Sequence, residues 1–84
     1  MTKDIKIKAN NKSVMTFSCD YYDGFGPKKS DYKKSSIIAQ IGIALHREAL
    51  NLDTGMKILD TEYACEVLEM LSCNEDVQIA VEIE

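Results

Sequence analysis

Four side chains of this sequence have the chemistry to bind a metal or attack a substrate: His46, the single histidine, and Cys19, Cys65 and Cys73. Zinc sites usually take such residues in pairs at short spacing, and no Cys-x-x-Cys pair occurs. An odd number of unpaired cysteines is typical of free thiols in a reducing compartment. We therefore expect no metal and no cofactor, and we expect the cysteines to be small buried hydrophobic residues.

Two short motifs have counterparts in catalytic sites. Asp53-Thr54-Gly55 resembles the active-site loop of retroviral-type aspartic proteases, where two carboxylates share a proton. That loop lies between strands, whereas this triplet follows a strong helical pattern, so we interpret it as the end of that helix, with Gly55 as the stopping residue. His46-Arg47-Glu48 is similar to the His-x-Glu of nucleobase deaminases, but their Pro-Cys-x-x-Cys is missing. The sequence therefore predicts a protein that is not an enzyme.

The connection 20–30 is the stretch best suited to binding. It is longer than ordinary connections of about 2–6 residues, and long connections often carry function. The aromatic and charged residues that we single out in it as partner-binding are Tyr21, Tyr22, Asp23, Phe25, Lys28 and Lys29. Tyrosine beside charge is typical of protein-binding surfaces, although loop aromatics of small domains also fold back over the core. Glycines and lysines before a helix could instead bind an anion, but the phosphate-binding P-loop pattern is absent, and a merely solvated basic loop is the simplest interpretation.

A second candidate surface is acidic. Glu62, Glu66 and Glu69 recur at helical spacing on one side of a predicted helix. Nine of the ten basic residues lie in 1–47 and ten of the fourteen acidic residues lie in 48–84, a split that predicts a dipolar surface. The acidic residues are either a solvated face or a surface for a basic partner, such as the nucleic-acid groove of another protein.

A long helical pattern over 31–52 organises the rest of the chain. Its broad apolar face includes Ile37 and Ile41, and Ser30 or Asp31 is the expected N-terminal cap. A thinner apolar stripe lies nearly opposite, formed by Tyr32, Ala39, Ile43 and Leu50 with His46 at its edge. Either the aromatic connection folds back over this stripe, or both lie open and form one binding surface. Gly42 costs about 1 kcal/mol relative to alanine in a helix, which indicates tight packing or the close approach of another element.

The remaining segments predict strands and a second helix. Residues 4–9 and 14–19 alternate between apolar and polar side chains and predict a hairpin with an Asn-rich turn, and residues 76–84 predict a third strand. Residues 62–72 predict a helix capped by Asp60 or Thr61, after a short extended piece at 56–59. We predict one α+β domain over 1–84: a small antiparallel three-stranded sheet in the chain order β-β-α-α-β, with two helices packed on one face. The basic first strand and the acidic last strand would pair favourably.

Composition narrows the function further. No apolar run reaches the roughly 18 residues of a membrane span, and residues 1–8 lack the apolar core of a signal peptide, so we expect a cytoplasmic protein without membrane contact. Our leading hypothesis is a small non-catalytic binding protein that occupies a surface of a protein partner, in the manner of phage or mobile-element inhibitors of host defence or nucleic-acid-handling complexes. The alternative is a nucleotide or nucleic-acid binding module that uses Lys6, Lys8, Lys28, Lys29, Lys33 and Lys34. A third interpretation is a homodimer through Ile43 and Leu50.

Overall fold

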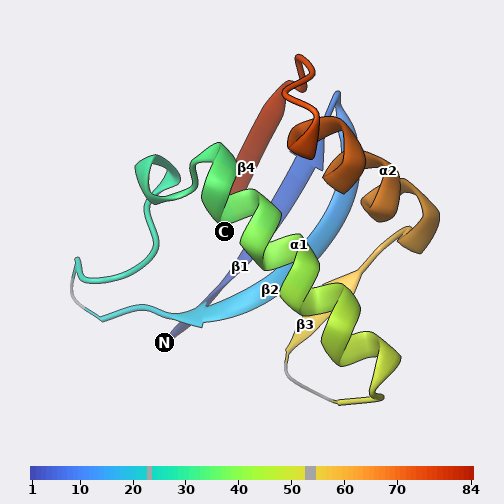
Figure 1. The fold of residues 1–84 in the computed structure, drawn as a ribbon. Helices are drawn as coiled ribbons and strands as arrows, with labels where there is room; N and C mark the ends of the chain where they lie inside the picture. The colour runs from blue at the N-terminus through green and yellow to red at the C-terminus, as the bar shows by residue number, and fades with distance from the viewer. Residues whose placement is uncertain (23, 53–54) are drawn as a thin grey trace.

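A computed structural model describes residues 1–22, 24–52 and 55–84 (Figure 1). It contains a four-stranded antiparallel sheet in the order β3-β2-β1-β4. The strands are β1 (Thr2–Ala9), β2 (Lys12–Asp20), β3 (Met56–Ile58) and β4 (Ile79–Ile83). The helices are α1 (Lys34–Ala49) and α2 (Thr61–Ser72), and a short 3-10 helix, η1 (Lys29–Asp31), precedes α1.

The predicted α+β class is confirmed, but the predicted number of strands is wrong. The extended piece after α1 is a true strand, β3, which pairs with β2 through the register Met15↔Ile58 and Phe17↔Met56. The chain order is therefore β-β-α-β-α-β. Three residues are too few to show a strand period, and only the pairing with β2 identifies β3 as part of the sheet.

The first and last strands are neighbours, as the charge pattern predicts. Ile5 pairs with Ile83 in the antiparallel register of β1 and β4. The Lys8 ammonium lies 2.9 Å from a Glu82 carboxylate oxygen, and this contact lowers the pKa of Glu82. Exposed ion pairs add little to stability, so the pair supports the register while apolar burial supplies most of the stability.

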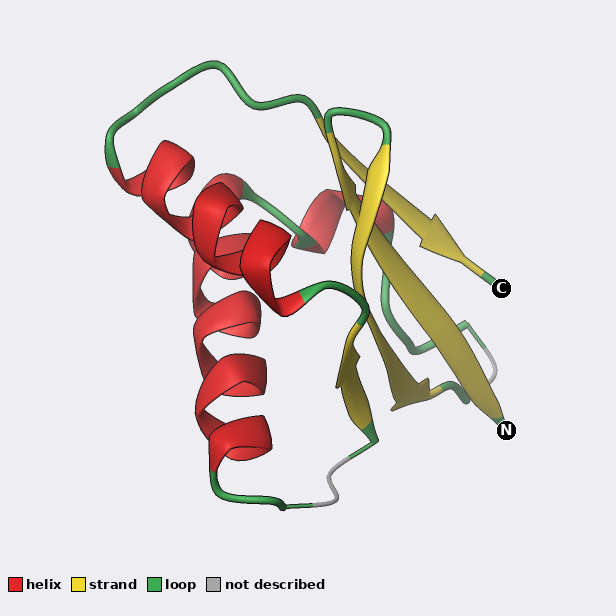
Figure 2. Ribbon diagram, turned by 90° about the vertical axis from the view of Figure 1, so that its right-hand side faces the viewer, coloured by secondary structure: helices red, strands yellow, loops and turns green. Residues whose placement is uncertain are grey.

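Both helices cover one face of the sheet and leave the other face open (Figure 2). The core lies between these two layers, and among the described residues no polar or charged side chain is buried in it. A β-bulge at Val14 interrupts the β1–β2 register, so that Val14 and Met15 are both buried although they are consecutive. The buried residues are Ile5, Ile7, Ala9, Val14, Met15, Phe17, Ile37, Ile41, Ala44, Ile58, Ala64, Val67 and Leu71.

Asparagine residues make the turns and end the helices. Asn10 and Asn11 both have positive φ, at 50° and 66°, which the two-residue hairpin turn requires. The helix α1 ends at Ala49, and the left-handed residue that follows its C-cap is Asn51 rather than the expected Gly55. Asn51 has φ 55°, and the Leu52 N–H donates to the Arg47 carbonyl at 3.0 Å, as in a Schellman motif. Asn74 has a φ of 57° just after α2.

The start of α1 differs from the prediction. The helix begins at Lys34 and its N-cap residue, Lys33, provides no side-chain cap. Asp31 is used in the preceding turn instead, where its Oδ2 accepts a 3.1 Å hydrogen bond from the Lys28 N–H. Among the described residues, no helix is long and apolar enough to cross a bilayer.

Candidate protein-binding surface

The connection after β2 is a structured turn. The Tyr21 N–H donates to the Met1 carbonyl at 2.7 Å, and Tyr22 and Phe25 exchange two backbone hydrogen bonds of 2.8 and 2.5 Å. Gly24, between them, has a φ of 89°, a value that favours glycine. Asp23 lies outside the described residues. The reciprocal bonds close a narrow loop whose two ends carry aromatic side chains.

The three aromatic residues of this loop fall into two groups. Tyr21 is half-buried, its ring lies against Gly26, and the Lys3 ammonium is 4.7 Å from the ring centroid. Tyr22 is 61% exposed and Phe25 is 81% exposed. We call Tyr22 and Phe25 the aromatic tip. Tyr21 is thus an anchor, and only the other two aromatics are available to a partner.

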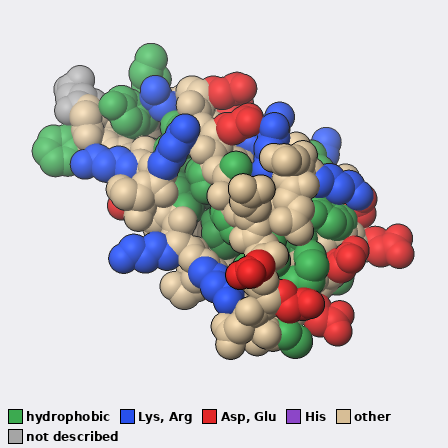
Figure 3. All heavy atoms as spheres, turned by 90° about the horizontal axis from the view of Figure 1, so that it is seen from above, with side chains coloured by type: hydrophobic (Ala, Val, Ile, Leu, Met, Phe, Trp, Pro, Cys, Tyr) green, Lys and Arg blue, Asp and Glu red, His purple; other side chains and the backbone are tan. Residues whose placement is uncertain are grey.

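Exposed lysines follow the aromatic tip along the chain, just before and within η1 and at the start of α1. Lys28 and Lys29 are exposed, as are Lys33 and Lys34, although the Lys34 ammonium donates to the Asn74 side-chain oxygen at 2.9 Å. Figure 3 shows this end of the molecule with basic and hydrophobic side chains together, while acidic side chains gather mainly at the opposite end. Basic side chains also lie among acidic ones, as Lys12 does beside Asp60 at 3.3 Å, so the dipolar surface stays a prediction.

The acidic stripe, Glu62, Glu66 and Glu69, lies on α2 and is exposed. Figures 1 and 2 both place α2 far from the connection that carries the aromatic tip. The structure therefore keeps Glu62, Glu66 and Glu69 together on α2 and leaves them on a surface separate from the aromatic tip.

The thin stripe of the long helix is open. Ile43 is 43% exposed and Leu50 is 55% exposed, and Ala39 and His46 are also exposed. Tyr32 does not belong to this stripe, because it precedes α1 and packs edge-on against Phe17, with 6.0 Å between ring centroids. Since Tyr22 and Ile43 are both exposed, the aromatic connection does not fold back over the helix.

Two of the three cysteines contradict the expected burial. Cys65 and Cys73 are exposed, and Cys19 is half-buried. Cys65 is exposed because it lies on the same polar side of α2 as the acidic stripe. Among the described residues, no cluster of three or more His, Cys, Asp or Glu side chains is placed to hold a metal ion.

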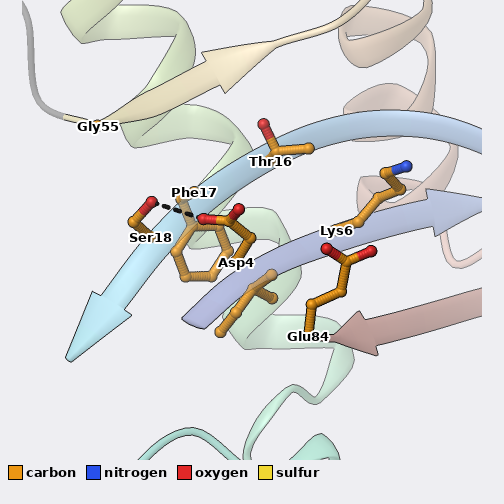
Figure 4. A pocket seen from close by; sticks show the side chains of 8 residues that line it. Asp4, Lys6, Thr16, Phe17, Ser18, Gly55 and Glu84 are labelled. Carbon is orange, nitrogen blue, oxygen red and sulfur yellow. Dashed lines mark hydrogen bonds between the residues drawn. The ribbon is translucent and has the colours of Figure 1, made fainter. Parts of the chain in front are cut away.

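The open face of the sheet carries a shallow hollow that the sequence analysis did not single out. It has a volume of about 290 Å³ and is lined by Asp4, Lys6, Thr16, Ser18, Gly55 and Glu84, among others (Figure 4). The Ser18 hydroxyl donates to Asp4 Oδ1 at 2.9 Å. The sequence feature that could have indicated this open face is the set of polar residues that alternate with the core residues along β1 and β2. Because carboxylates and a lysine line it together, the hollow favours neither anions nor cations.

Comparison with known protein families, curated proteins and solved structures gives no match for this chain. The fold is a small two-layer α+β arrangement, and the aromatic tip is its clearest candidate for a binding site.

Proposed function

We propose that the protein is a small non-catalytic binding protein that attaches to a protein partner through the aromatic tip and the adjacent Lys28 and Lys29. The observation that carries this proposal is the exposure of Tyr22 and Phe25 on a hydrogen-bonded turn. Large aromatic side chains each bury about 150–250 Å² when covered and dominate the energy of many interfaces.

The backbone hydrogen bonds between Tyr22 and Phe25 add to this argument. Tyr22 and Phe25 are held by two backbone hydrogen bonds to each other, and Tyr21 is fixed between Lys3 and Gly26. A preordered loop loses less conformational entropy on binding. The aromatic tip fits a partner with an apolar recess, and Lys28 and Lys29 favour a recess that is bordered by carboxylates.

Nucleic acid is the weaker alternative. Lys6 and Lys8 lie on the open sheet face among acidic residues, and Lys8 is paired with Glu82. A phosphate backbone tracking from the aromatic tip to this face would therefore meet carboxylates, and the net charge of −4 opposes non-specific binding.

We further propose that the partner is a host defence or nucleic-acid-handling complex that the protein inhibits. The acidic stripe on α2 supports this, because Glu62, Glu66 and Glu69 could compete with nucleic acid for a basic groove. The aromatic tip and the acidic stripe face different directions, so the partner must be concave or offer two separate contacts. Cytoplasmic action is part of the proposal, as are the reduced thiols of Cys65 and Cys73. A contact between two copies through Ile43 and Leu50 is a separate proposal.

The test is affinity capture followed by direct binding to the purified partner. The chain with Tyr22→Ser and Phe25→Ser should lose binding by at least tenfold, since two aromatic anchors are worth at least about 1.4 kcal/mol together. Lys57→Ala, a change on another surface, is the matched control and should bind normally. Equal binding of the tip variant and the parent chain would refute the proposal.

A salt titration separates the nucleic-acid alternative. If oligonucleotides bind at low salt with an affinity that falls steeply as salt rises, and Lys28→Ala with Lys29→Ala abolishes that binding, the alternative is favoured. The inhibitor proposal predicts no such binding. It also predicts that Glu62→Gln, Glu66→Gln and Glu69→Gln together weaken competition with nucleic acid for the captured partner.

A further inference from the structure

The outer side of α1 carries apolar side chains that the described part of the chain leaves uncovered. Ala39, Ile43, His46 and Leu50 follow one another at helical spacing and are all exposed; we call them the α1 stripe. Three small residues at heptad spacing border it on one side: Ser35, Gly42 and Ala49. The surface therefore combines two large exposed side chains, Ile43 and Leu50, with a border of small side chains.

Within the described chain, no neighbouring atom requires the residue at position 42 to be a glycine. A Cβ atom built on it would meet no described atom within 4 Å, apart from its own helix backbone and chain neighbours. A glycine inside a helix costs about 1 kcal/mol relative to alanine. A second surface that approaches α1 closely at this position would explain the glycine.

We propose that two copies of the chain associate through antiparallel pairing of their α1 helices. The α1 stripe is complementary to itself when the two-fold axis passes through its middle. Leu50 of one copy then lies opposite Ala39 of the second copy, and Ile43 lies opposite His46. Larger side chains thus face smaller or flatter ones in both pairs, so the stripe is complementary to itself. A closed isologous contact requires this self-complementarity, because both copies use the same surface.

The same axis accounts for the glycine. It sets the border of Ser35, Gly42 and Ala49 against the same border of the second copy, so Gly42 of one copy lies beside Ala49 of the other, and the missing side chain lets the two helices approach closely.

The charge distribution favours a second copy at this surface. Two copies of a protein with a net charge of −4 repel one another on average. The α1 stripe and its border of Ser35, Gly42 and Ala49 contain no Asp, Glu, Lys or Arg. The acidic residues of the two copies therefore do not meet in this contact. Antiparallel helices also set their dipoles in the favourable sense.

The size of the contact predicts a weak dimer. A standard interface buries about 800 Å² on each partner, and a contact limited to one face of a four-turn helix buries less. Association should therefore appear in the upper micromolar range of protein concentration.

Sedimentation equilibrium in reducing buffer, from low micromolar to near-millimolar protein, tests the proposal. The average mass should rise towards that of a dimer. Ile43→Glu and Gly42→Ala should each raise the dimer dissociation constant by about tenfold or more. Gly42→Ala should at the same time raise the melting temperature of the dilute monomer, which excludes misfolding as the cause of the lost association.

Two controls separate this contact from others. Cys65→Ser with Cys73→Ser should dimerise as the parent chain does, since no disulfide is involved. Tyr22→Ser should also dimerise normally, so the result is independent of partner binding through the aromatic tip. A monomer at the highest concentration would overturn the proposal, as would association that Ile43→Glu and Gly42→Ala leave unchanged.

Cross-linking tests the antiparallel direction. Ala39→Cys and Leu50→Cys are prepared separately, each with Cys65→Ser and Cys73→Ser, then mixed and oxidised. The disulfide should join the two different variants, because it needs Cβ atoms about 3.8 Å apart. A preference for disulfides between identical variants would indicate parallel helices and refute the arrangement.

Discussion

The ring of Tyr21 lies so close to Gly26 that a Cβ atom at position 26 would collide with it. Lys3 approaches the same ring, with its ammonium 4.7 Å from the ring centroid. The glycine is therefore required for space. Through this contact, the end of β2 fixes the base of the turn that presents Tyr22 and Phe25.

Gly26→Ala should displace the Tyr21 ring and disorder the aromatic tip. We expect a loss of about 1 kcal/mol in unfolding free energy, within the usual range for a steric clash. Amide NMR shifts should change in residues 20–28 and stay constant in α2 and β4. Gly42→Ala, where space is free, is the matched control and should be stabilising at low protein concentration; the same sign for both substitutions would contradict this explanation.

Tyr63→Phe should destabilise the protein by about 1 kcal/mol, the usual net value of one hydrogen bond. The Tyr63 hydroxyl donates a 2.7 Å hydrogen bond to the Ala9 carbonyl and so connects α2 to the end of β1. Urea unfolding measures the change. Tyr22→Phe removes an exposed hydroxyl and should leave the midpoint unchanged. An equal loss in both variants would show that the Tyr63 hydrogen bond has no special role.

Asp60→Ala should lower the melting temperature, and Asp60→Asn should recover most of the loss. Asp60 caps α2, since its Oδ1 accepts a 3.0 Å hydrogen bond from the Tyr63 N–H, and asparagine can accept the same bond. This bond, followed by the contact with Lys12, lowers the pKa of Asp60 below its ordinary 3.8.

The acid dependence follows from the direction of that shift. A carboxylate with a lowered pKa stabilises the fold above its ordinary pKa, and the contribution is lost as the pH falls through the folded-state value. The difference in stability between the parent chain and Asp60→Ala should therefore shrink below pH 3.8. A difference that stays constant into strong acid would rule out the charged cap.

Tyr32 should make the fold sensitive to alkali. Burial, helped by the neighbouring Cys19 and Asp31, raises the pKa of Tyr32 to about 12. A raised pKa means that the contribution is fully present below the ordinary value of 10.0 and is lost as the pH rises through about 12. Relative to Tyr32→Phe, the parent chain should lose stability across this window; parallel pH profiles for the two proteins would refute the assignment.

Residue alternation and caps predicted the local structure well. The hairpin over 4–9 and 14–19 and the helix over 62–72 are present, and Asp60 is the cap of that helix. These features depend on neighbours within a few positions, which the sequence displays directly. The pairing of β1 with β4 was predictable as well, because opposite charge recurs on the two strands.

Features that depend on distant contacts were missed. Nothing local distinguishes Met56–Ile58 from a loop, and Val14 breaks the alternation of β2 because of a bulge that only the β1 partner defines. For the candidate site, the sequence identified Tyr21, Tyr22 and Phe25 as a group. It could not separate Tyr21 from the other two, because that role depends on contacts with Lys3 and Gly26.

The pairing of β1 with β4 has a consequence for folding kinetics. Nearby residues are enough to form the β1–β2 hairpin and both helices. The sheet, however, is complete only when β1 pairs with β4, as in the pair Ile5 and Ile83. Long-range strand pairing is slow, because the intervening loop has to close first. Until β4 docks, β1 is an unprotected edge strand with exposed hydrogen-bonding groups. Aggregation during refolding should therefore begin at β1, and conditions that speed the docking of β4 should raise the yield of native protein.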